Sequence, residues 1–334
     1  MTISGLGPHG ERAAPPERVS LLPEDRTAAK AAAWRVAVVM HTLESDWAKQ
    51  LLAGMVGVFG DCGVVVTEVV DCGFNPRSQA AELNRLIGLR PDAIVSLPVA
   101  NEEVAAAHGR VTAAGIRLVL LDNAPTGLLP GTHYTALVSS DNFGLGKIAA
   151  AGLAAHLPKD SEVGVLGFAA DFFATNEREI AFSRWLQTNR PDIQLRVARF
   201  AEIDEAPKLA EQMVADYPKL AGLFVVWDTP AIEVARRLAT IRLPRPMATV
   251  DLGEAVAIEL AKGGAIVCVA AQQPSQHGIA AAQTAILSLL GRHVPAWVAL
   301  PGLVVTRDNV IESFQTVWRQ PAPREVLLSL KLSR

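Results

Sequence analysis

The sequence predicts an α/β fold of two Rossmann-like, doubly wound parallel-sheet lobes. From residue 34 onward, short runs rich in β-branched residues alternate with amphipathic, Ala- and Leu-rich runs of helical length. The alternation comes in two successive series, and the 334 residues exceed the usual size of one domain. Strands that alternate with helices form βαβ units, in which helices cover both faces of a parallel sheet.

The first series runs to residue 141. Its expected strands are "RVAVVM" (35–40), "GVVVTEVV" (63–70), "DAIVSL" (92–97) and "RLVLLD" (117–122). The helices expected between them are "WAKQLLAGMVGVFG" (47–60), "RSQAAELNRLIGL" (77–89) and "NEEVAAAHGRVTAAG" (101–115). The run "TALVSSD" (135–141) leads into the second series.

The second series repeats the pattern. Its expected strands are "EVGVLGF" (162–168), "IQLRVARF" (193–200), "AGLFVVW" (221–227) and "MATVD" (247–251). Its expected helices lie near 175–189, 205–216 and 229–240. A further strand, "AIVCVAA" (265–271), and a long helix over 275–291 follow this series. "WVALPGLVVTR" (297–307) and the helical "NVIESFQTVW" (309–318) close the ordered part, and 319–334 form a C-terminal tail. Residues 1–33 are rich in Pro, Ala and charged residues, which predicts a disordered leader.

Composition excludes several classes of protein. Half of the residues are apolar, 19% are charged, and the net charge of −3 offers no basic excess for nucleic acid. No apolar run reaches the ~18 residues that span a bilayer. The three cysteines, Cys62, Cys72 and Cys268, form no CxxC pair, so we expect no metal site and three buried thiols, with a Cys62–Cys72 bridge as the alternative.

Polar residues gather just after the predicted strands, where parallel sheets bind ligands. The segments "HTLESDW", "LDNAP", "SSDN", "VWDTPA", "VDLGEA" and "AAQQPSQ" are rich in Asp, Asn, Gln and Trp. Carboxylates and amides bind the hydroxyls of a neutral polyol, and aromatic rings cover its C–H faces. The exception we expect is Asp141, whose place before a helix is typical of an N-cap.

The sequence offers no chemistry for catalysis or phosphate binding. It has no GxxxxGK[ST], GxGxxG, GxSxG or HExxH motif, and "FGLGKIAA" lacks the spacing of a phosphate-binding loop. The seven histidines are scattered along the chain. We therefore expect no enzyme, no catalytic residues, no cofactor and no metal.

The order of these segments resembles the ribose-type solute-binding proteins of sugar ABC transporters, which have the type I periplasmic binding fold. The resemblance covers about residues 34–318 and is carried by "VAVVMHTLESDWAKQLLAGM", "LLDNAP", "SSDNFGLGKIAA", "NEREIAF", "LFVVWDTPAIEVARRL", "ATVDLGEAVAIELAKGG" and "AAQQPSQHGIAAAQTAILSLLG". It implies a hinge of three crossovers, near "SSD", "AAQQP" and "LPGLV". It also implies an N-terminal lobe of 34–140 with 273–300 and a C-terminal lobe of 141–272 with 301–318.

The resemblance further implies a ligand-binding set. Its members match family positions or lie beside them: His41, Ser45, Trp47, Asp122, Asn123, Phe173, Asn176, Arg178, Trp227, Asp251 and Gln272. Three positions depart from the ribose pattern. Asn123 and Asn176 stand where ribose binders have arginines, and Trp227 replaces an asparagine, so another sugar or a polyol is expected instead of ribose.

Two functions follow from the resemblance. The first is capture of a small carbohydrate-like ligand by hinge closure and its delivery to the permease of an ABC importer, by a monomer in the periplasm. The second is a cytoplasmic sensor related to the effector-binding core of lactose-repressor-like regulators. Only 33 residues precede the core, too few for a DNA-binding head, and they include no apolar signal run. The start of the chain therefore leaves a cytoplasmic location open.

Overall fold

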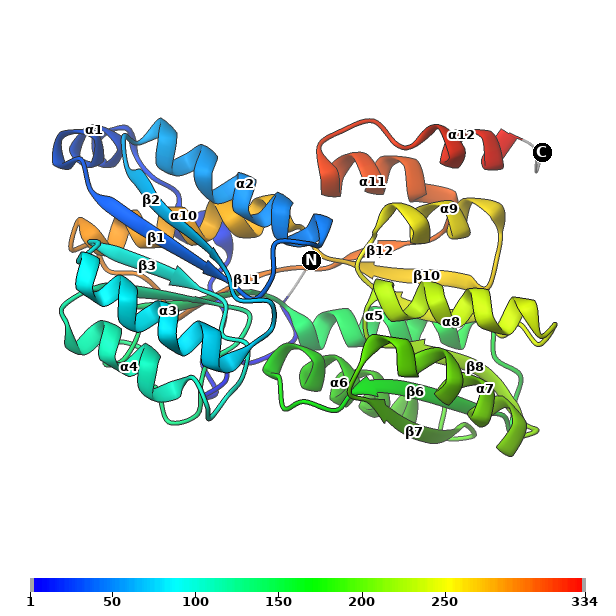
Figure 1. Ribbon diagram of the computed structural model, residues 1–334. Coiled ribbons are helices and arrows are strands. Elements are labelled where there is room, and N and C mark those ends of the chain that lie inside the picture. Colours follow the sequence, from blue (N-terminus) through cyan, green and yellow to red (C-terminus); the bar gives the residue numbers. More distant parts are fainter. Residues whose placement is uncertain (1–2, 332–334) are drawn as a thin grey trace. The chain divides into compact units, whose positions relative to one another are not determined.

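The structure is a computed structural model that describes residues 3–331 (Figure 1). Of these residues, 5–140 and 274–300 form one compact unit, here called the N-terminal unit. Residues 3–4, 141–273 and 301–331 form a second one, the C-terminal unit. The chain passes between the units at 4/5, 140/141, 273/274 and 300/301. Gln273 lies in the C-terminal unit, whereas the sequence analysis assigned it to the N-terminal lobe.

A six-stranded, entirely parallel sheet forms the centre of the N-terminal unit, in the order β11-β5-β4-β3-β1-β2. Its strands are β1 (Arg35–Met40), β2 (Val65–Asp71), β3 (Ala93–Ser96), β4 (Arg117–Leu121), β5 (Ala136–Ser140) and β11 (Trp297–Leu300). Its longer helices are α2 (Asp46–Asp61), α3 (Pro76–Leu89), α4 (Ala105–Ala113) and α10 (Pro274–Leu289). Helices α2 and α10 pack together, as do α3 and α4, so the sheet is doubly wound as predicted (Figure 1).

The C-terminal unit repeats this design in the order β12-β10-β9-β8-β6-β7, and only β12 runs antiparallel to its neighbour. Its strands are β6 (Glu162–Phe168), β7 (Gln194–Phe200), β8 (Leu220–Val225), β9 (Met247–Val250), β10 (Ile266–Ala271) and β12 (Leu303–Val305). Its helices are α5 (Asn142–Ala154), α6 (Phe173–Asn189), α7 (Ala206–Asp216), α8 (Asp228–Thr240), α9 (Glu254–Lys262), α11 (Val310–Trp318) and α12 (Arg324–Lys331). Short 3-10 turns lie at Ile203–Glu205 and Arg307–Asn309.

The strands of both sheets are buried along most of their length because helices cover both faces. In β3 and β5 every residue is buried, which explains why these strands read as continuous apolar runs. The edge strands β2 and β7 instead consist mainly of exposed and partly buried residues, and each has one buried residue, Val70 and Phe200. The three cysteines are free and buried, as expected. Among residues 3–331, no helix combines the length and apolar character needed to cross a bilayer.

The prediction of a disordered leader over 1–33 is wrong for residues 14–32. Ala14 bridges the free edge of β11, where its N–H donates to the Trp297 carbonyl and its carbonyl accepts from Ala299. The turn Pro16–Val19 and helix α1 (Pro23–Ala32) follow, and they bury Val19 and Ala29 completely. Composition missed this segment because an open sheet edge offers backbone partners that favour no particular residue type.

The tail 319–334 also differs from the expectation in part. Helix α12 occupies Arg324–Lys331 and packs against α9, with Val326 fully buried. Residues 332–334 lie outside the described part of the chain.

Candidate functional site

Two aspartates occupy equivalent positions in the two units. Asp122 directly follows β4 and Asp251 directly follows β9, and each has a positive φ, of 51° and 74°. In each case the aspartate N–H donates to the next strand, to Val138 at 3.1 Å and to Ala270 at 3.1 Å. A non-glycine residue in this backbone region is strained, and such strain concentrates at functional sites. Each sheet therefore presents one carboxylate at the carboxyl end of an inner strand.

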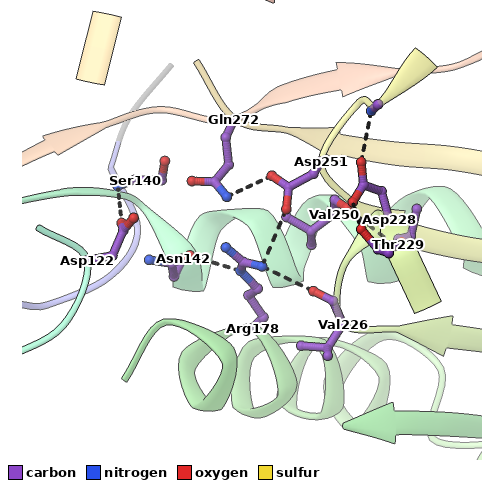
Figure 2. A network of polar contacts seen from close by, with 12 residues as sticks. Asp122, Ser140, Asn142, Arg178, Val226, Asp228, Thr229, Val250, Asp251 and Gln272 are labelled. Atoms are coloured by element: carbon purple, nitrogen blue, oxygen red, sulfur yellow. Dashed lines mark hydrogen bonds and ion pairs between the residues drawn. The ribbon is translucent and has the colours of Figure 1, made fainter. Parts of the chain in front are cut away.

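In the C-terminal unit, Arg178 organises the polar residues around Asp251. Arg178 is only 5% exposed, donates through Nε to Asn142 at 2.9 Å, and donates through Nη1 to the Val226 carbonyl at 3.1 Å. The same Nη1 lies 3.9 Å from Asp251 Oδ2. Figure 2 shows this guanidinium between the ends of three elements. The oxygens of Asn142 and Val226 are neutral, so they do not compensate the positive charge of Arg178. The guanidinium can therefore attract a carboxylate or an oxygen atom of a ligand.

Gln272 completes the network on the other oxygen of Asp251. Its Nε2 donates to Asp251 Oδ1 at 2.7 Å from the end of β10 (Figure 2). A second carboxylate, Asp228, caps the neighbouring turn by accepting from the Gly253 N–H at 3.0 Å. Burial, together with the nearby charge of Asp251, raises the pKa of Asp228 far above its usual value. Together these groups form an acceptor-rich site with one fixed cation.

Aromatic side chains lie beside this network. Trp227, just before α8, packs against Phe168 and Phe200 with ring centroids 5.3 and 5.2 Å away. Phe173 opens α6, and Asn176, one turn further on, donates to Asp171 at 2.6 Å. Trp227 is therefore anchored within its own unit, which fixes the ring in place.

In the N-terminal unit, the first strand ends in a row of aromatic rings. The ring of His41 lies 5.9 Å from that of Trp47, and Trp47 lies 6.0 Å from His277 at the start of α10, both edge to face. His41 Nδ1, Trp47 Nε1 and His277 Nδ1 are buried and have no hydrogen-bond partner among the described residues. Burial also lowers the pKa of His41 to about 4, against a smaller opposing effect of Asp71, so its ring is neutral at pH 7. Unpaired buried nitrogens are costly, and a row of them indicates a place for a polar ligand.

Asp122 lies at the end of this row. It is 4% exposed, and its Oδ1 accepts from the Ser140 N–H at 3.4 Å, as Figure 2 shows. Asn123 is fully buried, and its amide donates to the Pro98 carbonyl at 3.3 Å. Ser45 is the N-cap of α2, because its hydroxyl accepts from the Ala48 N–H at 3.1 Å. A ligand role for Ser45 stays a prediction beside this capping role.

The sequence-predicted residues are divided between the two units. His41, Ser45, Trp47, Asp122 and Asn123 belong to the N-terminal unit. Phe173, Asn176, Arg178, Trp227, Asp251 and Gln272 belong to the C-terminal unit. The prediction that Asp141 is a helix cap is confirmed, since its Oδ1 accepts from the Gly144 N–H at 2.9 Å.

Sequence reasoning missed His277, Asn142 and Asp228. His277 lies one residue beyond the strand-end segment "AAQQPSQ", within the first turn of α10, and it could have been found by extending each segment by one helical turn. Asn142 was missed because it directly follows Asp141, and the segment was interpreted as a helix cap. Among the described residues, no group of three or more His, Cys, Asp or Glu side chains is arranged to hold a metal ion.

Comparison with known proteins identifies the family. The sequence profile of the periplasmic binding protein domain matches residues 36–293, which is most of the chain. The chain belongs to this family. The resemblance to the type I periplasmic binding proteins is thereby confirmed, together with the predicted fold class. No curated protein sequence is significantly similar to this periplasmic binding protein.

Solved structures show the same fold. An ABC transporter solute-binding protein from Agrobacterium vitis, bound to alpha-D-tagatopyranose, is 22% identical with a TM-score of 0.78, and the match covers 87% of this chain and 100% of that one. A Mycobacterium smegmatis solute-binding protein with bound glycerol is 20% identical, with a TM-score of 0.77 and coverage of 87% and 99%. An Agrobacterium radiobacter protein in complex with D-arabinose is 20% identical, with a TM-score of 0.75 and coverage of 85% and 98%.

Proposed function

We propose that this periplasmic binding protein captures a sugar or polyol other than ribose and delivers it to an ABC importer. The observation that carries the proposal is the pair of strained aspartates, buried Asp122 and half-buried Asp251, each beside polar groups at the carboxyl end of its own sheet. Carboxylates that accept from hydroxyls bind neutral sugars strongly, because each bond is charge-assisted. Neighbours in fold bind alpha-D-tagatopyranose, D-arabinose and glycerol, which supports this ligand class.

The remaining roles belong to the same proposal. The eleven residues predicted from the sequence, from His41 to Gln272, contact the ligand. The lobes are those predicted from the sequence, 34–140 with 273–300 and 141–272 with 301–318, except that Gln273 belongs with the second lobe and residues 5–33 with the first, and they hinge at three crossovers. The protein works as a monomer in the periplasm, hands its ligand to a permease and performs no catalysis, in keeping with the family to which it belongs.

Calorimetric titration and thermal shift with D-arabinose, D-tagatose, allitol, D-fucose and glycerol test the function. At least one of them should bind and raise the melting temperature. Asp122→Asn and Asp251→Asn should each weaken that binding about tenfold or more, because the loss of the charge weakens charge-assisted bonds of roughly 1.5–3 kcal/mol. Asparagine suits this test because it tolerates positive φ.

Asp204→Asn is the matched control, since Asp204 lies in an exposed turn of the C-terminal unit. It should leave affinity unchanged. Full affinity in both Asp122→Asn and Asp251→Asn would refute the proposed site. Failure of every sugar and polyol to bind the wild-type protein would refute the ligand class.

A further inference from the structure

His277 stands in a position that determines its tautomer. It lies in the first turn of α10, is 1% exposed, and its Nε2 is 2.8 Å from the Val138 carbonyl. A carbonyl oxygen only accepts hydrogen bonds, so Nε2 carries the proton. In the neutral ring, Nδ1 then presents a lone pair and is an acceptor.

This acceptor faces a second one. Nδ1 of His277 lies 4.0 Å from Asp122 Oδ2, which is beyond hydrogen-bond distance. Both residues are bound to the backbone of β5: the Val138 carbonyl accepts from His277 Nε2 and from the backbone N–H of Asp122 at 3.1 Å, and Asp122 Oδ1 accepts from the Ser140 N–H at 3.4 Å. The spacing of the two acceptors is therefore fixed by the backbone of β5.

Within the described part of the protein, no donor bonds to Nδ1 of His277. Nδ1 is buried and has no hydrogen-bond partner among the described residues, and the same holds for Nε1 of Trp47, whose ring lies 6.0 Å from that of His277. A buried acceptor without a donor costs free energy that a bound group recovers. The occupant must supply two donors, and it can accept from the indole N–H.

We propose that His277 and Asp122 together recognise two neighbouring hydroxyl groups of the ligand, which makes His277 a specificity-determining residue for a vicinal diol. One hydroxyl donates to Asp122 Oδ2 and its neighbour donates to His277 Nδ1. A single hydroxyl carries one proton and cannot serve both acceptors, whereas adjacent hydroxyls of a sugar or polyol supply one each. This inference rests on the proposed function and names the part of the ligand that the N-terminal unit recognises.

Two substitutions separate recognition from support of the fold. In His277→Gln, the side-chain amide nitrogen can take the place of Nε2 and donate to Val138, but the acceptor at Nδ1 is lost. In His277→Asn, the side-chain oxygen can take the place of Nδ1, but the bond to Val138 is lost. We expect His277→Gln to melt near the wild type while it binds D-arabinose or D-tagatose about three- to tenfold more weakly. His277→Asn should melt lower and keep more of the affinity.

Affinities for monodeoxy analogues of the same two sugars test recognition directly, because a purely structural role of His277 would lower the affinity for every analogue alike. The analogue that lacks the hydroxyl bound by His277 should bind wild-type protein and His277→Gln equally, whereas the parent sugar should distinguish them. Nitrogen chemical shifts of His277 should also show a neutral ring with the proton on Nε2 at pH 7.5 in the unliganded protein.

The outcomes separate this inference from the proposed function. If no sugar or polyol binds wild-type protein, both fail. If D-arabinose or D-tagatose binds but His277→Gln retains full affinity, or loses it equally for every deoxy analogue, the inference fails and the proposed function stands. An imidazolium with both nitrogens protonated would also overturn it, because Nδ1 would then be a donor to Asp122.

Discussion

At the scale of single residues, the two sheets share one feature, an aspartate with left-handed backbone directly after a strand. Asp122 and Asp251 adopt left-handed backbone directly after a strand, at a cost of order 1 kcal/mol each. Their N–H groups bond to the adjacent strand, which holds the strained conformation. Each carboxylate is thereby turned away from the strand direction and toward the polar groups of its own unit.

Asp228 makes the C-terminal unit sensitive to pH. Burial raises its pKa above the unfolded value, to about 7, and the charge of Asp251 adds to this effect. The folded state therefore holds the proton more tightly than the unfolded chain. The contribution of this carboxyl to the free energy of unfolding is fully present below pH ~4. It is lost as the pH rises through the pKa of the folded state.

We therefore predict that Asp228→Asn gains stability over the wild type as the pH rises from 4 to 8. Asparagine still accepts from the Gly253 N–H but does not ionise, so the gain should be of order 1 kcal/mol or more. Chemical denaturation of both proteins at several pH values measures it. Only the difference is informative, because buried His41 and His108, with pKa values lowered to about 4, give the opposite slope below pH 6.5. A constant difference across this range would contradict the prediction.

At the scale of elements, close helix contacts position the site residues. A Cβ on Gly278 of α10 would overlap the Leu51 carbonyl of α2, and one on Gly54 of α2 would overlap the Ser275 carbonyl of α10. In the C-terminal unit, a Cβ on Gly146 of α5 would overlap the Arg178 carbonyl of α6. These contacts let α10 bring His277 beside Trp47, and let α6 bring Arg178 to Asn142.

We predict that Gly54→Ala destabilises the protein by about 1–3 kcal/mol, because the obstructing atom belongs to the backbone and cannot turn aside. Sugar affinity should fall as well, since a shift of α10 moves His277. Gly57→Ala is the matched control on the same helix, where a Cβ meets nothing within 4 Å. It should stabilise by up to about 1 kcal/mol through helix propensity. Equal melting temperatures for the two variants would show that α2 and α10 can separate freely.

At the scale of the whole molecule, the connectivity suits a hinged binding protein. The chain passes between its two units at 140/141, 273/274 and 300/301, as the family resemblance implies, and additionally at 4/5. At the passage at 4/5, Ser4 is bound to the C-terminal unit, because its N–H donates to Asp141 Oδ2 at 2.6 Å. Each unit keeps its own core, so ligand binding can change their arrangement without disrupting either sheet.

Small-angle scattering tests this expectation. A sugar that binds in the calorimetric test should reduce the radius of gyration of the protein, because the ligand favours a closed arrangement of the units. Asp251→Asn at the same ligand concentration, with its weaker binding, should show a smaller reduction. An unchanged radius for the wild type at saturating ligand would contradict closure on binding.

The sequence by itself determined the two doubly wound sheets, the buried thiols, the Asp141 cap and the strand-end positions of Asp122 and Asp251. These features follow from local patterns: the period of apolar residues, the type of residue before a helix, and the end of a β-branched run. A parallel sheet brings its strand ends to one edge whatever the details of packing, so the polar residues there could be found in advance.

Only the tertiary structure decided the docking of residues 14–32, the tautomer of His277 and the partners of Arg178. Each depends on atoms distant in sequence: the free edge of β11 for Ala14, the Val138 carbonyl for His277, and Asn142 with Val226 for Arg178. Hydrogen-bond partners are set by three-dimensional proximity, and the same His or Arg in another register would have other neighbours. That is why composition alone suggested disorder for a segment that buries Val19 completely.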